Sequence, residues 1–294
     1  MTQLEVLLPF YGDPDLMKAA VRSVLAQDCT TWRLTVVDDC YPDPSIPEWF
    51  DGLDDPRVTY HRNDANLGVS GNFARALELA EGDYVVFLGC DDLLLPHYVS
   101  SIRGAVDTYP DTTIIATEVE VIDADGLVVD PLADRVKRAL SPRPLGHVMG
   151  GERLLGSLLR GNWTYFPNLA WHRPTVLEYG FNETYEVVPD LALLVDLIRN
   201  GGTMVVVPGT HFQYRRHPAS VSALRALSGE RFREERAYFR EARRSLLAQG
   251  QRRAARAARW HLSSRLHALA LVPRSVTSTG EREVVIDLLR HVVG

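Results

Sequence analysis

Short, continuous apolar runs alternate with stretches of helical periodicity over the first 120 residues. In the first of these stretches, Leu16, Ala20 and Val24 lie on one helical face. Strands separated by helices of this length imply βαβ units and a mostly parallel sheet. Because the runs are apolar throughout rather than at alternate positions, we expect both faces of the sheet to be covered. The predicted strands are residues 4–9, 34–37, 57–61, 84–88 and 113–117, and the later helices are 69–80 and one that begins near Pro96.

The middle of the chain begins with a break in this pattern. Residues 130–150 are rich in Pro, Gly, Arg and Asp and show little periodicity, which predicts a long surface loop. Helical and strand patterns return over residues 151–222, where the predicted strands are 203–207 and 211–215.

Beyond Leu224 the composition shifts to Arg, Ala, Glu and Leu, without a strand signal. The predicted helices of this part are about 228–248, 252–269 and 280–292. We therefore predict an α/β domain over residues 1–222 and a helical C-terminal extension over 223–294. Within the α/β domain we expect a ligand-binding half, residues 1–120, and a second half, residues 121–222.

The composition is that of a soluble globular protein, with 46% hydrophobic and 24% charged residues among 294. The net charge of −6 gives no reason to expect nucleic acid as a partner, although residues 225–274 carry 13 arginines against four glutamates. Three cysteines without a CxxC spacing indicate a reduced compartment and no zinc site. The chain starts without a secretory signal pattern, and no apolar run approaches the roughly 18 residues of a bilayer span. We expect a cytoplasmic protein, at most peripheral at the inner face of a membrane.

Polar clusters follow four of the predicted strands directly. Because ligands of open α/β sheets bind outside the carboxyl ends of the strands, these clusters should line one crevice. Two adjacent carboxylates there repel each other, and a hard divalent cation relieves that repulsion. GxGxxG and P-loop motifs are absent, so a pyrophosphate bound in the crevice would need a cation. The clusters are Pro9-Phe10-Tyr11, Asp38-Asp39, Asn66-Leu67-Gly68 and Asp91-Asp92.

In order and spacing, the segments V-L-L-P-F-Y, V-V-D-D, N-L-G-V-S-G-N and F-L-G-C-D-D resemble the family 2 glycosyltransferases over roughly residues 3–222. The resemblance implies a GT-A fold, a Rossmann-like and mostly parallel sheet flanked by helices, and a nucleotide-sugar donor. It implies that Pro9, Phe10 and Tyr11 contact the base and ribose. Asp39 would accept a hydrogen bond from the base imide, which favours a UDP- or dTDP-sugar. Asn66 is a candidate donor contact, although the alternative of a residue that shapes its loop stays open.

For the acid pair, the resemblance implies that Asp91 lies near the ribose and that Asp92 binds Mn²⁺ or Mg²⁺. The first acid of the family's usual D-x-D is Gly89 here. A plain helix cap is the alternative for the pair. Cys90 between them is interpreted as a packing residue rather than a reactive thiol.

Further matches to the family lie downstream. Asp190 maps to the catalytic base, and the alternative is a helix cap, because an apolar helical stretch follows it. His217 maps to a residue that reaches the metal or diphosphate, although it could simply be exposed in its loop. Arg215 and Arg216 would be phosphate partners.

A dense polar–aromatic cluster, N-W-T-Y-F-P-N, occupies residues 162–168. Core aromatics are one interpretation. Acceptor binding is the other, because aromatic faces stack on sugar rings. Its candidate acceptor residues are Trp163, Tyr165 and Asn168.

Together these features predict an inverting, metal-dependent transferase that moves a sugar to a hydroxyl of a sugar, a lipid-linked acceptor or a small molecule. A sugar-1-phosphate nucleotidyltransferase and a catalytically silent nucleotide-sugar-binding protein are the alternatives. The arginine-rich helices could pack on the α/β domain, which we favour, form a homodimer or contact anionic lipid. Their apolar positions are Phe232, Tyr238, Phe239, Leu246 and Leu247.

Overall fold

The computed structural model describes residues 2–143, 145–182, 184–185, 187–216, 230–278 and 282–293. Its centre is one mixed sheet with strand order β3-β2-β1-β4-β9-β6-β10-β5, in which β7 pairs with β6 and β8 with β10. The strands are β1 (Leu4–Phe10), β2 (Trp32–Asp38), β3 (Val58–Arg62), β4 (Tyr84–Phe87), β5 (Leu93–Leu94), β6 (Ile114–Ile122), β7 (Val128–Val129), β8 (Met149–Gly150), β9 (Ala170–His172) and β10 (Thr203–Arg215).

The first four predicted strands form the parallel half of this sheet. In register, Leu7 of β1 lies opposite Phe87 of β4, and Phe10 lies opposite Asp38 of β2. The carboxyl ends of the neighbouring strands β2, β1 and β4 therefore meet at one edge. β9 is antiparallel to both β4 and β6, and β10 is parallel to β6. The prediction of a mostly parallel α/β sheet flanked by helices is confirmed.

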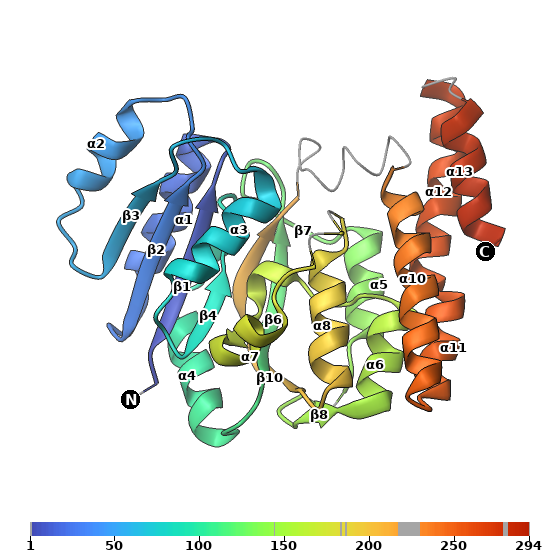
Figure 1. Cartoon of the computed structure of the whole chain (residues 1–294). Coiled ribbons are helices and arrows are strands. Elements are labelled where there is room, and N and C mark those ends of the chain that lie inside the picture. The colour runs from blue at the N-terminus through green and yellow to red at the C-terminus, as the bar shows by residue number, and fades with distance from the viewer. Residues whose placement is uncertain are drawn as a thin grey trace.

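Helices cover both faces of the sheet (Figure 1). Alternate residues of β1 explain this, because Val6 and Leu8 belong to one buried cluster and Leu7 to another. The first cluster includes residues of α1, α2 and α4, and the second includes residues of α6, α8, α10 and α11. The helices are α1 (Pro14–Leu25), α2 (Ser45–Asp51), α3 (Gly68–Leu79), α4 (Tyr98–Thr108), α5 (Leu132–Leu140), α6 (Gly151–Arg160), α7 (Arg173–Tyr179), α8 (Pro189–Arg199), α10 (Glu230–Ala248), α11 (Arg252–Trp260), α12 (Leu262–Ser278) and α13 (Arg282–Val293), with a 3₁₀ turn, η1 (Phe166–Asn168).

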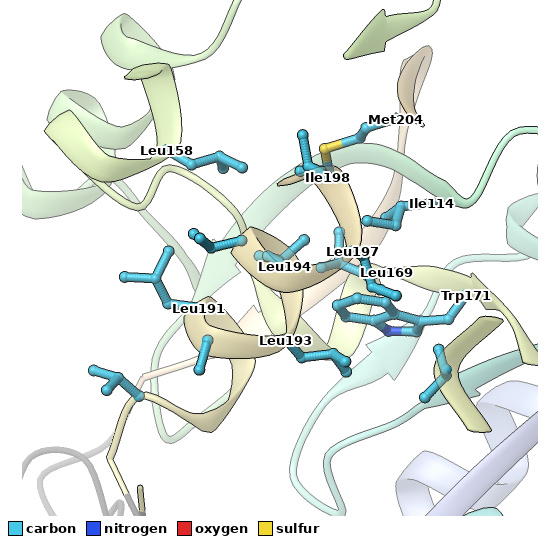
Figure 2. Close-up of a cluster of buried hydrophobic side chains, with 14 of the residues drawn as sticks. Ile114, Leu158, Leu169, Trp171, Leu191, Leu193, Leu194, Leu197, Ile198 and Met204 are labelled. Carbon is cyan, nitrogen blue, oxygen red and sulfur yellow. The ribbon is translucent and has the colours of Figure 1, made fainter. Parts of the chain in front are cut away.

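Helix α8 is central to the second cluster. Figure 2 shows its side chains gathered with Trp171 of β9 and Met204 of β10. Seven residues of this helix are buried, and it is apolar on nearly all sides. Such a helix is enclosed by other elements, which holds its first turn in a fixed place beside the sheet.

Two predictions for the middle of the chain are wrong. Residues 130–150, expected as a loop, contain helix α5, whose one buried side chain is Asp134. Apolar periodicity could not reveal a helix that buries a carboxylate. The two strands predicted at 203–207 and 211–215 are one strand, β10, with register shifts between Val206 and Phe212. Gly209 has a φ of +107° at this bulge, a conformation open to glycine.

The arginine-rich helices pack against the rest of the molecule, which was the favoured interpretation. Tyr238, Phe239 and Leu246 are buried in the cluster around α8, and Phe232 is buried against α12 and α13. Leu247 is exposed. The helix predicted at 252–269 is divided at His261, where φ is +25°. The predicted domain boundary at 222/223 lies outside the described residues, and among the helices described none is long and apolar enough to cross a bilayer.

Candidate functional site

The acid pair at the end of β2 accepts hydrogen bonds from several protein donors. Asp38 accepts hydrogen bonds from the Tyr60 hydroxyl (2.5 Å) and the Tyr41 amide (2.7 Å), and its carboxylate is buried. Arg62 Nη1 lies 3.4 Å from the same carboxylate. These contacts give Asp38 the structural role expected of a buried, satisfied acid.

Asp39 is 2% exposed and accepts three hydrogen bonds. The amides of Leu67 (2.8 Å) and Gly68 (2.9 Å) and the side-chain amide of Asn63 (2.9 Å) are the donors. Because a carboxylate has about four lone-pair sites, one site on Oδ2 is left for another donor. Asn66 Oδ1 accepts from the Gly68 amide at 2.9 Å, which is the loop-shaping contact left open above.

The segment after β1 presents one large side chain to solvent. Tyr11 is 55% exposed, whereas Pro9 is half-buried and Phe10 is buried. The Tyr11 ring meets the Tyr41 ring edge-on at a centroid distance of 5.4 Å. Tyr11 is therefore the member of the predicted trio whose side chain is available to a base or ribose.

The acid pair at the end of β4 has a different environment. Asp92 is 1% exposed and accepts one hydrogen bond among the described residues, from the Arg215 amide at 2.8 Å. Burial, and then the neighbouring Asp91 charge, hold the pKa of Asp92 well above its usual range. The same burial raises the pKa of the Cys90 thiol to about 12, which supports its interpretation as a packing residue.

Both carboxylates of this pair converge over Gly89. A Cβ atom at Gly89 would lie 2.6 Å from Asp92 Oδ2 and 3.0 Å from Asp91 Oδ1. Glycine thus leaves room for two carboxylate oxygens, ligands of the kind that Mg²⁺ and Mn²⁺ bind. Within the described ranges, no group of three or more His, Cys, Asp or Glu could hold a metal ion. His217, the other predicted ligand, lies outside the described residues.

Arg215 connects the end of β10 to this corner. Its guanidinium is buried and donates to the carbonyls of Asp91 (2.8 Å), Asp123 (3.0 Å) and Ala124 (3.1 Å). Three carbonyl acceptors and the nearby Asp92 charge explain why a buried cation is tolerated there. The observed contacts of Arg215 are therefore structural, and its predicted contact with phosphate is untested.

Arg216 makes a paired contact with helix α5. Its Nε and Nη2 donate to the two oxygens of Asp134 at 2.6 and 2.8 Å. Asp134 is 1% exposed and also accepts from the Tyr165 hydroxyl at 2.6 Å. Although burial opposes it, the Arg216 contact lowers the pKa of Asp134. The Arg216 side chain is 38% exposed, and no other side chain within the described residues accepts a hydrogen bond from its guanidinium.

Asp190 lies in the first turn of α8, at the same end of the sheet as the strand-end acids (Figure 1). Its pKa is raised by burial, which outweighs the Leu191 amide and the charges of Lys137 and Arg231. Asn162 Nδ2 lies 3.4 Å from its carboxylate. A carboxylate with a raised pKa and few donors is suited to accept a proton.

Lys137 of α5 is the cation next to this acid. Its ammonium donates to the Thr164 carbonyl at 2.7 Å and lies 4.1 Å from the centre of the Tyr165 ring. Burial is the main reason that its pKa falls to about 8, and the charge of Asp190 opposes that shift. Thr164 in turn donates to Asn162 Oδ1 at 2.6 Å. A polar chain therefore connects Lys137 with Asp190.

A cavity of about 410 Å³ lies between β6, α5 and residues 163–169. Trp163, Tyr165 and Asn168 line it, but each is at least nine-tenths buried. Their polar atoms are engaged, since Trp163 donates to Ser157 (3.0 Å) and Asn168 exchanges hydrogen bonds with Thr117 (2.8 Å). These contacts favour the core interpretation for the three side chains, while the cavity keeps an acceptor possible.

Sequence reasoning missed Asp134, Lys137 and the role of Asn162. Asp134 and Lys137 are three residues apart, a helical spacing, within a stretch taken for a loop. Asn162 was visible only as part of the polar–aromatic cluster. A signal that could have identified α5 is Asp134 in the first turn with Lys137 and Arg138 in the last, which suits the helix dipole.

Comparison with known proteins gives a family match over part of the chain. Residues 5–141 match the model of Glycosyl transferase family 2. The putative colanic acid biosynthesis glycosyl transferase WcaA of Escherichia coli K12 is 33% identical over 98 residues, which make up 33% of this chain. That segment is 35% of WcaA, so the chain spans about a third of the length of this relative.

Two solved structures share the fold. One is S. aureus TarS 1–349 in complex with UDP-GlcNAc, with a TM-score of 0.60 and 13% identity over 98% of this chain and 72% of that chain. The other is the mannosyltransferase PcManGT of Pyrobaculum calidifontis in complex with GDP-Man and Mn²⁺, with a TM-score of 0.58 and 16% identity over 99% of this chain and 87% of that chain. The similarity extends through the C-terminal helices and confirms the predicted fold class.

Proposed function

We propose that this chain, which belongs through residues 5–141 to glycosyl transferase family 2, transfers a sugar from a nucleotide-sugar to an acceptor hydroxyl. The observation that carries the proposal is the convergence of Asp91 and Asp92 over Gly89, at the same end of the sheet as the first turn of α8, which contains Asp190. Asp91 and Asp92 could hold a cation for the diphosphate, and Asp190 could accept the proton of the acceptor hydroxyl. WcaA is described as a glycosyl transferase, and TarS was solved with UDP-GlcNAc, which supports the same class of donor.

The acceptor hydroxyl would lose its proton to Asp190. Burial disfavours the ionised form of this carboxyl, so proton uptake during the reaction relieves an existing cost. The charges of Lys137 and Arg231 and the contact with Asn162 oppose that cost. A single displacement with this base gives inversion at the anomeric carbon.

The donor would lie along the carboxyl ends of β1, β2 and β4. Tyr11 is the exposed ring for the base or ribose, and the remaining lone pair of Asp39 is available to an imide N–H of uracil or thymine. Asp92, with Asp91 beside it, would hold Mn²⁺ or Mg²⁺, whose charge would stabilise the departing diphosphate. The partly exposed Arg216 guanidinium would contact phosphate oxygens.

The test is a thermal-shift panel of UDP, dTDP and GDP and their sugars, with and without Mn²⁺. Ligand binding to the folded state raises the melting temperature with occupancy. We expect stabilisation by UDP or dTDP compounds that requires the cation. Slow, cation-dependent hydrolysis of the preferred donor would separate a transferase from a silent binding protein. If no nucleotide stabilises the protein with or without Mn²⁺, the proposal is wrong.

A further inference from the structure

Residues of α10 and α13 line a groove. These helices lie at the side of the molecule opposite β2 and β3 (Figure 1). It has a volume of about 730 Å³. Basic and aliphatic side chains share its lining, and none of the proposed donor or base residues is among them. The lining residues are Arg233, Arg236, Ala237, Arg240, Ile286, Leu289, Arg290 and Val293.

The groove carries an excess of positive charge. Asp287 is the acid beside it, and Arg233 (2.7 Å) and Arg236 (3.1 Å) both pair with this one carboxylate. Arg240 and Arg290 are exposed and have no ion pair within the described part of the chain. Two guanidinium groups are thus available to an anion.

Protein donors engage acidic side chains of α10, which explains the excess of positive charge at the groove. Glu234 accepts from the amides of Val187 and Val188, and Glu241 accepts from the Tyr185 hydroxyl. Glu235 is buried against Ser264 and His291. Protein donors thus engage the glutamates at 234, 235 and 241, while Arg233, Arg240 and Arg290 of the groove are exposed.

The aliphatic side chains of α13 stand out beside these arginines. Ile286, Leu289 and Val293 are 45%, 46% and 81% exposed. Their spacing of three and four residues places them on one helical face. The opposite face packs inward through Val284 and Leu288, so α13 already has its apolar contact with the protein. The outward row is a second apolar surface.

We propose that the α10–α13 groove docks on an anionic lipid bilayer. Arg240 and Arg290 would bind lipid phosphates, and the exposed row of α13 would enter the boundary between headgroups and acyl chains. A second copy of this chain is disfavoured as the occupant, because two such grooves facing each other would oppose like charges. The proposal does not depend on sugar transfer.

The test is co-sedimentation of the full chain with vesicles of phosphatidylcholine, with and without phosphatidylglycerol, without nucleotide or cation. We expect binding only to the anionic vesicles, weakened by salt. The double variant R240Q/R290Q should bind about 30-fold more weakly, since each basic residue near an anionic surface contributes about fivefold. The variant I286S/L289S should weaken binding without changing the charge.

The matched control is R243Q/R244Q, which removes two exposed arginines of the same helix outside the groove. It should bind nearly as the wild type does, and all variants should keep the wild-type melting temperature. Equal losses in R240Q/R290Q and R243Q/R244Q would show unspecific attraction and overturn the proposal. So would an absence of wild-type binding, or a dimer in analytical ultracentrifugation that R240Q/R290Q abolishes.

Discussion

The ends of β2 and β4 carry the same dipeptide, Asp-Asp, on either side of β1, yet their environments differ. At the end of β2, Asp38 and Asp39 accept hydrogen bonds from tyrosine, asparagine and backbone donors. At the end of β4, Asp92 receives one amide within the described residues, and its carboxylate converges with that of Asp91.

The difference separates Asp38, which holds the fold, from a pair whose carboxylates converge where a cation could bind. Neutral and charged donors satisfy the β2 pair, so its negative charge is already compensated. Asp92 is buried beside the Asp91 charge and accepts one hydrogen bond among the described residues, an arrangement that costs free energy. A bound cation would offset that cost. Without a cation, we therefore expect mutations at the two strand ends to have opposite effects on stability.

The largest effect should come from Asp190, whose pKa is raised by desolvation as that of Asp92 is. Asp190→Asn should lower turnover by about 10²- to 10⁴-fold, because the amide cannot take the acceptor proton. Donor affinity measured by calorimetry should stay near the wild-type value. Asp196→Asn, on the same helix, is the control and should keep most activity. Wild-type turnover of Asp190→Asn would exclude it as the base.

Asp92→Asn should abolish the cation-dependent part of donor binding, a loss of about 100-fold in affinity, because one charged ligand is removed. Without cation, its melting temperature should equal or exceed that of the wild type, since the repulsion with Asp91 disappears. Calorimetry with Mn²⁺ and UDP, together with thermal melts, checks both parts. The exposed Asp107 serves as control in Asp107→Asn. A clear loss of stability without cation would contradict this view of the β4 pair.

Asp38→Asn should have the opposite result. It should reduce the free energy of unfolding by about 1.5–3 kcal/mol, because charge-assisted hydrogen bonds from Tyr60 and Tyr41 are weakened. Urea unfolding measures the change, and Asp51→Asn on the surface of α2 should leave it unaltered. Should Asp38→Asn and Asp92→Asn change stability equally, the distinction between the two ends fails.

The smallest effect is a pH shift through Lys137. Asp190 acts as a base only when ionised, so activity falls as the pH drops through its raised pKa. The Lys137 ammonium lowers that pKa, and Lys137→Met should therefore move the acid limb of kcat/KM to higher pH. Arg135→Met, on the exposed side of α5, should leave the limb in place. If the acid limb of kcat/KM does not move in Lys137→Met, the charges of Lys137 and Asp190 are not coupled.

Much of the parallel half could be predicted from local pattern. Each apolar run marks a buried strand, and a polar cluster directly after it must lie at the strand's carboxyl end, because parallel strands align these ends. The antiparallel insertion of β9 between β4 and β6 could not be predicted, since its three residues carry no distinct pattern. Helix α5 was not predicted because its one buried side chain, Asp134, makes an ionic contact with Arg216, which gives no apolar periodicity.

The sequence by itself therefore determined the strands, their common polar edge and the family resemblance. Only the tertiary structure decided which acids are satisfied and which are not. Asp134 meets Arg216 across 82 positions, and Asn162 meets Asp190 across 28. Hydrophobic periodicity is a property of neighbouring residues, whereas the electrostatic state of a carboxylate depends on donors that folding brings to it from distant segments.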